Sequence, residues 1–155
     1  MSYKYKKVIF VCNDNTCRGP MAEVIFKRFS VEMGIEAVSR GIVVLFPQPS
    51  NPKAEMVLRN HELLLENHTS KRIAKEDITE NTLILTMTEK EKKTILEEFE
   101  EVAFLFDVFT VKEFTDEEGD VIDPYGGDLM DYESCYTDLA RLIKKTVVKL
   151  NGEMQ

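Results

Sequence analysis

The chain has 155 residues, of which 43% are hydrophobic and 31% charged, and its formal net charge is −8. These values are typical of one globular domain and exclude a disordered or collagen-like chain. The acidic charge argues against nucleic-acid binding, which depends on Lys and Arg neutralising phosphates. The longest apolar runs, 8–12 and 42–46, are too short for a membrane span or a signal peptide. We therefore expect a single cytoplasmic domain over residues 1–155, a monomer without nucleic-acid or membrane partners.

The cysteine and histidine content predicts neither a disulfide framework nor a metal site. Cys12, Cys17 and Cys135 are odd in number, which suits free thiols in a reducing compartment. No second cysteine pair follows, and His61 and His68 lie seven residues apart in a charged region. We expect both histidines to be solvated and the chain to need no metal and no cofactor.

The first half of the chain alternates between strand and helix patterns. Residues 8–11 form a continuous β-branched and aromatic run, typical of a buried strand. Pro20 opens a helix that ends at Gly34, since proline suits the first helical turn and glycine the C-terminal end. A short strand is expected over 37–39, and a helical segment over 53–66 that can be broken near Asn60.

The second half repeats the alternation. A strand is expected over 82–87 and a helix over 88–99, where Thr88 and Glu91 form the sequence signature of a capping box. The remaining elements are a strand over 107–111, an acidic and glycine-containing loop over 115–128, and a helix over 131–150. Regular alternation of this kind favours an α/β fold. We predict a three-layer sandwich, with a four-stranded parallel sheet and helices on both faces.

The segment after the first strand carries the strongest chemical signal. Ligands of such sheets bind beyond the carboxyl ends of the strands, and a loop that runs into a helix N-terminus directs backbone N–H groups at an anion. Cys12 stands at the start of this loop and Arg18 at its end. We expect a lowered pKa for the Cys12 thiol and a phosphate-binding guanidinium at Arg18. The spacing alone is common, but this order of strand, cysteine, polar loop, arginine and proline predicts attack on a phosphoryl group through a phosphocysteine intermediate.

Such a reaction also needs an acid for the leaving group and a base for water. Asp123 is the best candidate, because Pro124 stiffens the turn that follows it and Tyr125 places an aromatic side chain beside it. An ordinary surface turn would have the same composition. The combination with the Cys12 loop makes us prefer the catalytic interpretation.

Residues 8–12, 18–23 and 123–127 together resemble the low-molecular-weight protein tyrosine phosphatase family, and the resemblance covers nearly the whole chain. It implies a phosphorylated protein or peptide as substrate, with phosphate or another oxyanion in the loop. It assigns Cys12 as nucleophile, Arg18 as phosphate clamp and Asp123 as general acid and then base. Asn15 would hold the loop in shape, and Cys17 would protect Cys12 through a reversible disulfide. The substrate-binding residues it implies are Asn13, Asp14, Asn15, Thr16, Cys17 and Tyr125.

Thr16 bears on the choice of substrate. By resemblance, tyrosine phosphatases of the family carry a larger aliphatic residue here, whereas the bacterial protein-arginine phosphatase branch carries threonine. Residues 85–88 and 108–114 are also similar to that branch. Phosphoarginine and phosphotyrosine therefore both remain open, with phosphoarginine favoured by the wider similarity.

Two positions depart from the family pattern. Asp14 replaces a glycine, and its carboxylate is expected to repel phosphate unless it points outward or Arg40 pairs with it. Gly19 replaces a serine whose hydroxyl would stabilise the Cys12 thiolate. These departures predict a working but slower phosphatase, whose pocket is lined in part by Val43, Leu45 and Phe46.

Three other functions share parts of this pattern. An arsenate reductase of the same fold needs a further redox cysteine pair, which residues 82–90 lack. A phosphotransfer subunit of a sugar-uptake system does not require Arg18 or Asp123. A non-catalytic or weakly active regulator that binds phosphate or phosphopeptides is the remaining alternative.

Overall fold

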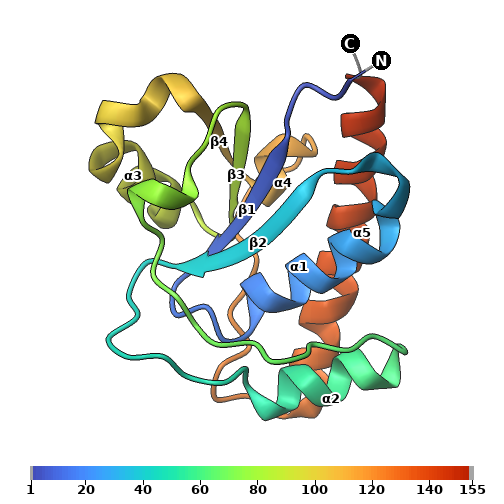
Figure 1. Cartoon of the computed structure of the whole chain (residues 1–155). Coiled ribbons are helices and arrows are strands. Elements are labelled where there is room, and N and C mark those ends of the chain that lie inside the picture. Colours follow the sequence, from blue (N-terminus) through green and yellow to red (C-terminus); the bar gives the residue numbers. More distant parts are fainter. Residues whose placement is uncertain (1, 154–155) are drawn as a thin grey trace.

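The computed structural model describes residues 2–153, which form a parallel sheet with helices on both of its faces (Figure 1). The strand order is β2-β1-β3-β4, and each neighbouring pair is parallel. The strands are β1 (Lys7–Cys12), β2 (Glu36–Gly41), β3 (Thr82–Thr86) and β4 (Phe106–Thr110). The helices are α1 (Arg18–Phe29), α2 (Pro52–Asn60), α3 (Glu89–Glu98), α4 (Val111–Phe114) and α5 (Leu129–Gly152). The predicted sandwich is confirmed.

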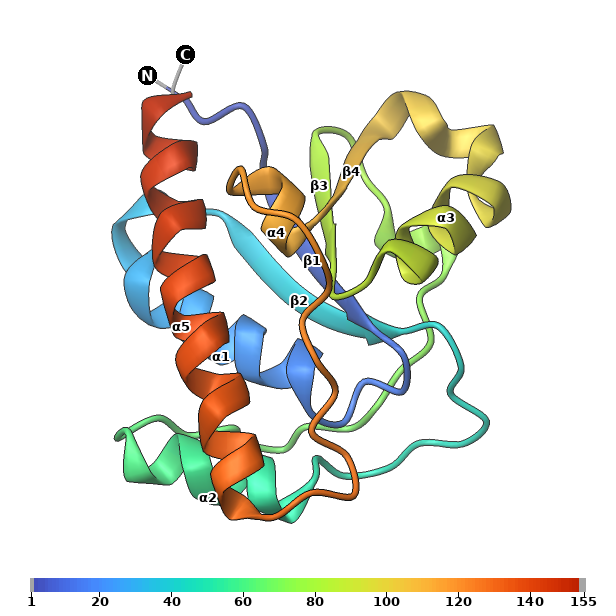
Figure 2. The same cartoon turned by 180° about the vertical axis from the view of Figure 1, so that it is seen from behind.

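Alternate side chains of β1 enter two separate cores. Val8 and Phe10 join the apolar cluster that contains residues of α1 and α5, on one face of the sheet. Ile9 and Val11 join the cluster that contains Ile95 of α3, on the other face. The continuous apolar run in this strand is explained by burial on both faces. In Figure 2 the sheet lies between α5 and α3, and α2 crosses the lower end of α5.

The helical segment expected over 53–66 is broken near Asn60, as the sequence allowed, but residues 61–66 beyond the break are not helical. Helix α2 ends at Asn60, and Glu62 and Asn67 both have positive φ, which ends regular helical structure. Leu63 nevertheless lies in the apolar core. The segment therefore keeps apolar residues beyond α2, and these extended the helical pattern in the sequence.

The strand expected over 107–111 was placed about one residue too late, and the helix that follows it was missed. Val111 begins α4, and the N-cap of this short helix is Thr110. Thr110 and Glu113 form a capping box of the kind that was correctly predicted for Thr88 and Glu91. The sequence signature that located the start of α3 could therefore have located the start of α4 as well. The 3₁₀ segments Val31–Met33, Lys75–Asp77 and Glu100–Leu105 were not predicted either.

Within residues 2–153, no helix combines the length and the apolar character that crossing a membrane requires.

Leu139 tests the contribution of α5 to stability. Its side chain is completely buried in the core cluster. Leu139→Ala is expected to lower the free energy of unfolding by about 2–5 kcal/mol, because the substitution leaves a cavity in a packed core. Val148→Ala on the same helix, where the side chain is 71% exposed, should change the unfolding free energy by less than about 0.5 kcal/mol. Urea unfolding of the two variants measures both values, and equal losses would contradict this packing of α5.

Candidate active site

The loop between Cys12 and Arg18 lies at the carboxyl edge of the sheet. Cys12 is the last residue of β1, and Arg18 is the first residue of α1. Backbone hydrogen bonds hold the start of this loop against the residues that follow β2, since the N–H groups of Ile42 and Val43 donate to Asn13 O at 2.9 and 2.8 Å. The loop therefore begins on a central strand and ends on a helix N-terminus, as the sequence predicts.

Cys12 and Arg18 are both buried at this edge. The Cys12 Sγ atom accepts a hydrogen bond from the Gly19 N–H at 3.4 Å. Arg18 Nη1 donates to Val121 O at 2.9 Å, and Arg18 Nη2 lies 3.9 Å from Glu91 Oε2. The guanidinium is thus held from two sides by elements distant in sequence, which fixes its plane beside the loop.

Asp123, the third predicted catalytic residue, lies beside Arg18. Its Oδ2 atom lies 3.5 Å from Arg18 Nη2, and its side chain is 49% exposed. The other oxygen, Oδ1, accepts the Tyr125 N–H at 3.0 Å. Asp123 and Tyr125 line a pocket of about 490 Å³ whose remaining residues are Asn13, Asp14, Thr16, Gln48, Pro49, Ser50, Asn51 and Pro52.

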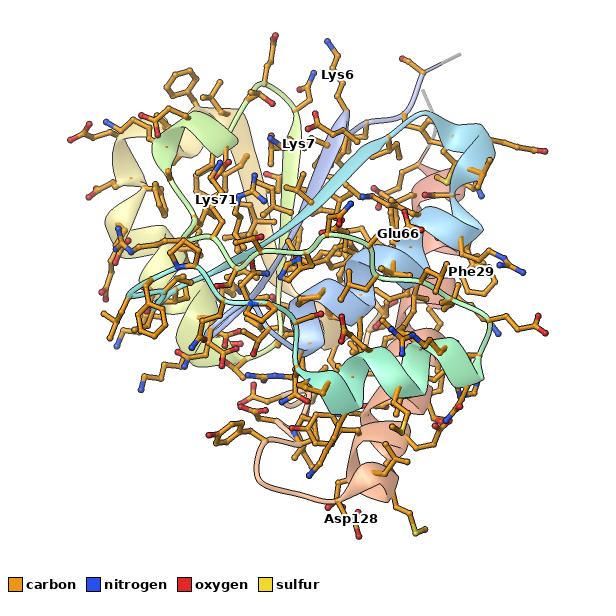
Figure 3. All side chains as sticks on the ribbon, turned by 60° about the horizontal axis from the view of Figure 1, so that its bottom comes forward. Lys6, Lys7, Phe29, Glu66, Lys71 and Asp128 are labelled. Atoms are coloured by element: carbon orange, nitrogen blue, oxygen red, sulfur yellow. The ribbon has the colours of Figure 1, made fainter. Side chains whose placement is uncertain are left out.

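Asn15 has a conformation unusual for a residue with a side chain. Its φ is 63°, and the residue is completely buried. The backbone N–H of Lys71, a residue labelled in Figure 3, donates to Asn15 Oδ1 at 2.9 Å. His68 Nε2 lies 2.7 Å from Asn15 O. These contacts hold the loop in its left-handed turn.

One of the two histidine predictions was wrong. His68 is half-buried against the loop rather than solvated. His61 is exposed as expected, stacked on Tyr136 and in contact with Glu133.

Asp14 turns back onto its own loop. Its Oδ1 atom accepts hydrogen bonds from Thr16 N at 3.2 Å and from Thr16 Oγ1 at 2.9 Å. The proposed pairing of Arg40 with Asp14 was wrong. Arg40 Nη2 instead donates to Asp77 Oδ1 at 3.1 Å, and Arg40 Nη1 donates to Ser39 O at 2.7 Å.

The pocket wall also differs from the prediction. Val43, Leu45 and Phe46 are exposed and are not among the residues that line it. Residues 48–52 of the same connection take that position. The proline-containing segment folds back here, where the Asn51 N–H donates to Thr16 O at 2.8 Å. Asn51 Nδ2 also donates to the hydroxyl of Tyr132 on α5 at 3.1 Å.

Comparison with known proteins agrees with this geometry. Residues 7–155 match the family model described as low molecular weight phosphotyrosine protein phosphatase. The chain belongs to this family. A protein-arginine-phosphatase of Bacillus subtilis is 35% identical over 150 residues, covering 94% of this chain and 97% of the relative. The protein-tyrosine-phosphatase PtpB of Staphylococcus aureus is 37% identical over 139 residues, covering 90% of this chain and 95% of the relative.

A solved structure adds chemical information about the family. It is a YwlE arginine phosphatase in which serine replaces the active-site cysteine and is phosphorylated. The TM-score is 0.85 at 32% sequence identity, and the match covers 94% of this chain and 95% of that one. Like its family, this chain is a protein phosphatase that works through a covalent phosphoenzyme and acts on phosphorylated proteins.

The sequence predicted a lowered pKa for the Cys12 thiol of this phosphatase, and the structure gives a raised one. Burial raises the pKa of the Cys12 thiol to about 12, although the Arg18 guanidinium and the Gly19 N–H both lower it. Asp14 and Glu91 raise it further through their negative charge. Complete burial disfavours the thiolate more strongly than one cation and one hydrogen bond favour it. Burial therefore opposes formation of the Cys12 thiolate in the free site.

Gly19→Ser is expected to lower the pKa of this thiol. A Cβ atom at position 19 would lie 3.1 Å from Cys12 Sγ and 3.4 Å from Ser39 Cβ, so the added hydroxyl comes within reach of the sulfur. A hydroxyl that donates to the thiolate stabilises the charged form. We expect a fall of about 1 pKa unit, corresponding to one such hydrogen bond. The pH dependence of Cys12 alkylation by iodoacetate measures it, and Gly19→Ala, which adds the Cβ without the hydroxyl, should not lower the pKa. An equal fall in both variants would contradict the hydrogen-bond argument.

Cys17 lies on the buried side of the loop, close to Cys135 of α5. A hydrogen bond with the Cys135 thiol and burial raise the pKa of Cys17 well above its ordinary value. All three cysteines are free and buried. The reversible disulfide between Cys12 and Cys17 stays a prediction.

Glu91 and Val121 are site residues that the sequence did not reveal. Glu91 was identified only as a capping residue, and its Oε1 does accept the N–H groups of Met87 and Thr88 at 3.0 and 3.1 Å. Its second oxygen faces Arg18. Burial raises the pKa of Glu91 even though Arg18 and the backbone N–H groups lower it.

Among residues 2–153, no group of three or more potential metal-ligating His, Cys, Asp or Glu side chains was found.

Proposed function

We propose that this chain removes phosphoryl groups from phosphoarginine or phosphotyrosine in proteins, with Cys12, Arg18 and Asp123 as its catalytic residues. The observation that carries the proposal is the position of Arg18. Its buried guanidinium lies within 3.5 Å of the Asp123 carboxylate and close enough to Cys12 to lower the pKa of the thiol. A nucleophile, a cation and a carboxyl group are thereby gathered around one loop.

In the first step the Cys12 sulfur attacks phosphorus and forms an S–P bond. The bond from phosphorus to the bridging oxygen or nitrogen breaks, and Asp123 gives its proton to that leaving atom. Arg18 and the backbone N–H groups of the loop, apart from that of Thr16, which donates to Asp14, stabilise the negative charge on the phosphoryl oxygens during transfer. The dephosphorylated protein side chain then departs.

In the second step the Asp123 carboxylate takes a proton from water, whose oxygen attacks phosphorus. The S–P bond breaks, inorganic phosphate forms and Cys12 returns as a thiolate. The half-exposed position of Asp123 suits this role, because the carboxylate must meet both a bulky leaving group and water.

The raised pKa of Cys12 determines where the required proton comes from. The reacting complex needs a proton on Asp123 and none on Cys12. Burial favours the protonated thiol. Passage of this proton through solvent to Asp123 prepares both groups without changing the total. Substrate binding must supply the free energy for this transfer.

We also propose that the protein works as a cytoplasmic monomer, without nucleic-acid or membrane partners. Three free thiols suit a reducing compartment, and the net charge of −8 disfavours polyanions.

The deciding experiment incubates the protein with p-nitrophenyl phosphate and with matched peptides that carry phosphoarginine or phosphotyrosine. We expect repeated turnover, measured as inorganic phosphate released per protein molecule, on at least one peptide. Binding of the peptides by calorimetry without release of phosphate would contradict the proposal and favour a non-catalytic regulator.

A further inference from the structure

The Asp14 carboxylate determines which hydrogen-bonding groups Thr16 has free. Thr16 Oγ1 lies 2.9 Å from Asp14 Oδ1, and Thr16 N lies 3.2 Å from the same oxygen. An ionised carboxylate only accepts hydrogen bonds, whereas a hydroxyl has one hydrogen to donate and two lone pairs. The hydroxyl hydrogen of Thr16 therefore points to Asp14. Because its one hydrogen is used there, Thr16 Oγ1 can only accept a hydrogen bond from a bound substrate.

Both residues are half-buried and line the same pocket as Asp123 and Tyr125. The wall of this pocket therefore contains the lone pairs of Thr16 Oγ1 and the negative charge of Asp14. A wall of this kind favours a substrate that has N–H donors next to its phosphoryl group. It disfavours one whose bridging atom is only an acceptor.

The two candidate substrates differ in this respect. In phosphoarginine the bridging nitrogen and the rest of the guanidinium carry N–H donors. In phosphotyrosine the bridging oxygen carries none. We propose that Asp14 is a positioning residue that selects phosphoarginine over phosphotyrosine, by holding the Thr16 hydroxyl as an acceptor. This inference rests on the proposed function, in which the phosphoryl group occupies the loop between Cys12 and Arg18.

The charge of Asp14 has a second effect. The carboxylate repels the phosphoryl group of both substrates, so its charge lowers both values of kcat/KM and leaves their ratio nearly unchanged. The residue that departs from the family pattern would reduce general phosphatase activity and increase selectivity.

The test measures kcat/KM on two peptides of identical sequence around phosphoarginine or phosphotyrosine. Asp14→Gly should lower the phosphoarginine-to-phosphotyrosine ratio of kcat/KM about fivefold, the size of one hydrogen bond's net contribution. Most of the change should be a gain on phosphotyrosine. Asp14→Asn, whose amide oxygen accepts the same two bonds, should keep the ratio within about twofold of the wild type.

Thr16→Val tests whether Asp14 acts through the hydroxyl. It should lower the ratio about as much as Asp14→Gly does, and Asp14→Gly in the Thr16→Val background should have little further effect. An unchanged or higher ratio in Asp14→Gly would overturn the inference while leaving the proposed function intact. A fall of the ratio in Asp14→Asn as large as the fall in Asp14→Gly would also overturn the inference. The proposed function fails separately, if the wild-type protein releases phosphate from neither peptide.

Discussion

Cys12→Ser is expected to reduce kcat by about 10⁴-fold or more on every phosphorylated substrate, because it removes the nucleophile of both half-reactions. The buried Cys12 sulfur accepts the Gly19 N–H and lies at the start of the loop, where a serine oxygen accepts the same bond. The fold should therefore survive, and binding of a phosphorylated peptide should persist. Initial rates with p-nitrophenyl phosphate and calorimetric binding measure the two properties.

Cys135→Ser is the matched control for this experiment. It makes the same chemical change at another buried cysteine, on α5, which lies against Cys17 rather than at the start of the loop. Its kcat should stay within about threefold of the wild type, a change too small to involve a lost chemical group. A Cys12→Ser protein that keeps more than about a tenth of wild-type kcat would contradict the assignment of the nucleophile.

Asp123→Asn is expected to lower kcat by about 10²–10⁴-fold on substrates with a poor leaving group, because the amide cannot donate the required proton. The loss should be much smaller for formation of the phosphoenzyme from p-nitrophenyl phosphate, whose leaving group needs little protonation. The amide keeps an oxygen for the Tyr125 N–H and has nearly the same shape, so the local turn should persist. Phenyl phosphate and p-nitrophenyl phosphate, compared by rapid mixing, measure the difference in the first step.

Asp116→Asn is the control on the same connection. Asp116 is exposed and has a φ of 63°, a conformation that asparagine tolerates, so this variant should keep wild-type kinetics. Equal losses on the two aryl phosphates in Asp123→Asn would contradict a role in protonating the leaving group.

The sequence predicted the sheet and the loop well because both depend on local patterns. The apolar run 8–11, followed by Cys12, places the thiol at the carboxyl edge of a strand. Capping signals at Thr88 and Glu91 locate the start of α3. The turn at Pro124 and Tyr125, considered together with the Cys12 loop, pointed to Asp123, and the family resemblance agreed. Asp123 lies 3.5 Å from Arg18 although 105 residues separate the two in the chain.

The errors concern contacts that only the folded chain creates. His68 reaches Asn15 across 53 residues, and Arg40 pairs with Asp77 across 37 residues rather than with nearby Asp14. Glu91 faces Arg18 because β3 lies beside β1, an order that the sequence does not specify. The raised pKa of Cys12 reflects complete burial, which depends on how α1 and the sheet pack around the sulfur. Local patterns therefore locate the loop, and tertiary packing sets the charge state of its residues.

The central claim is that phosphorus becomes bonded to the Cys12 sulfur during turnover. The most direct test quenches the Asp123→Asn variant during turnover of p-nitrophenyl phosphate, when slow hydrolysis lets the intermediate accumulate, and maps the phosphorylated peptide by mass spectrometry. We predict one phosphoryl group on the peptide that contains Cys12, lost over time as inorganic phosphate appears. Turnover with the phosphoryl group on another side chain, or with no phosphorylated peptide in variant and wild type alike, would contradict the account.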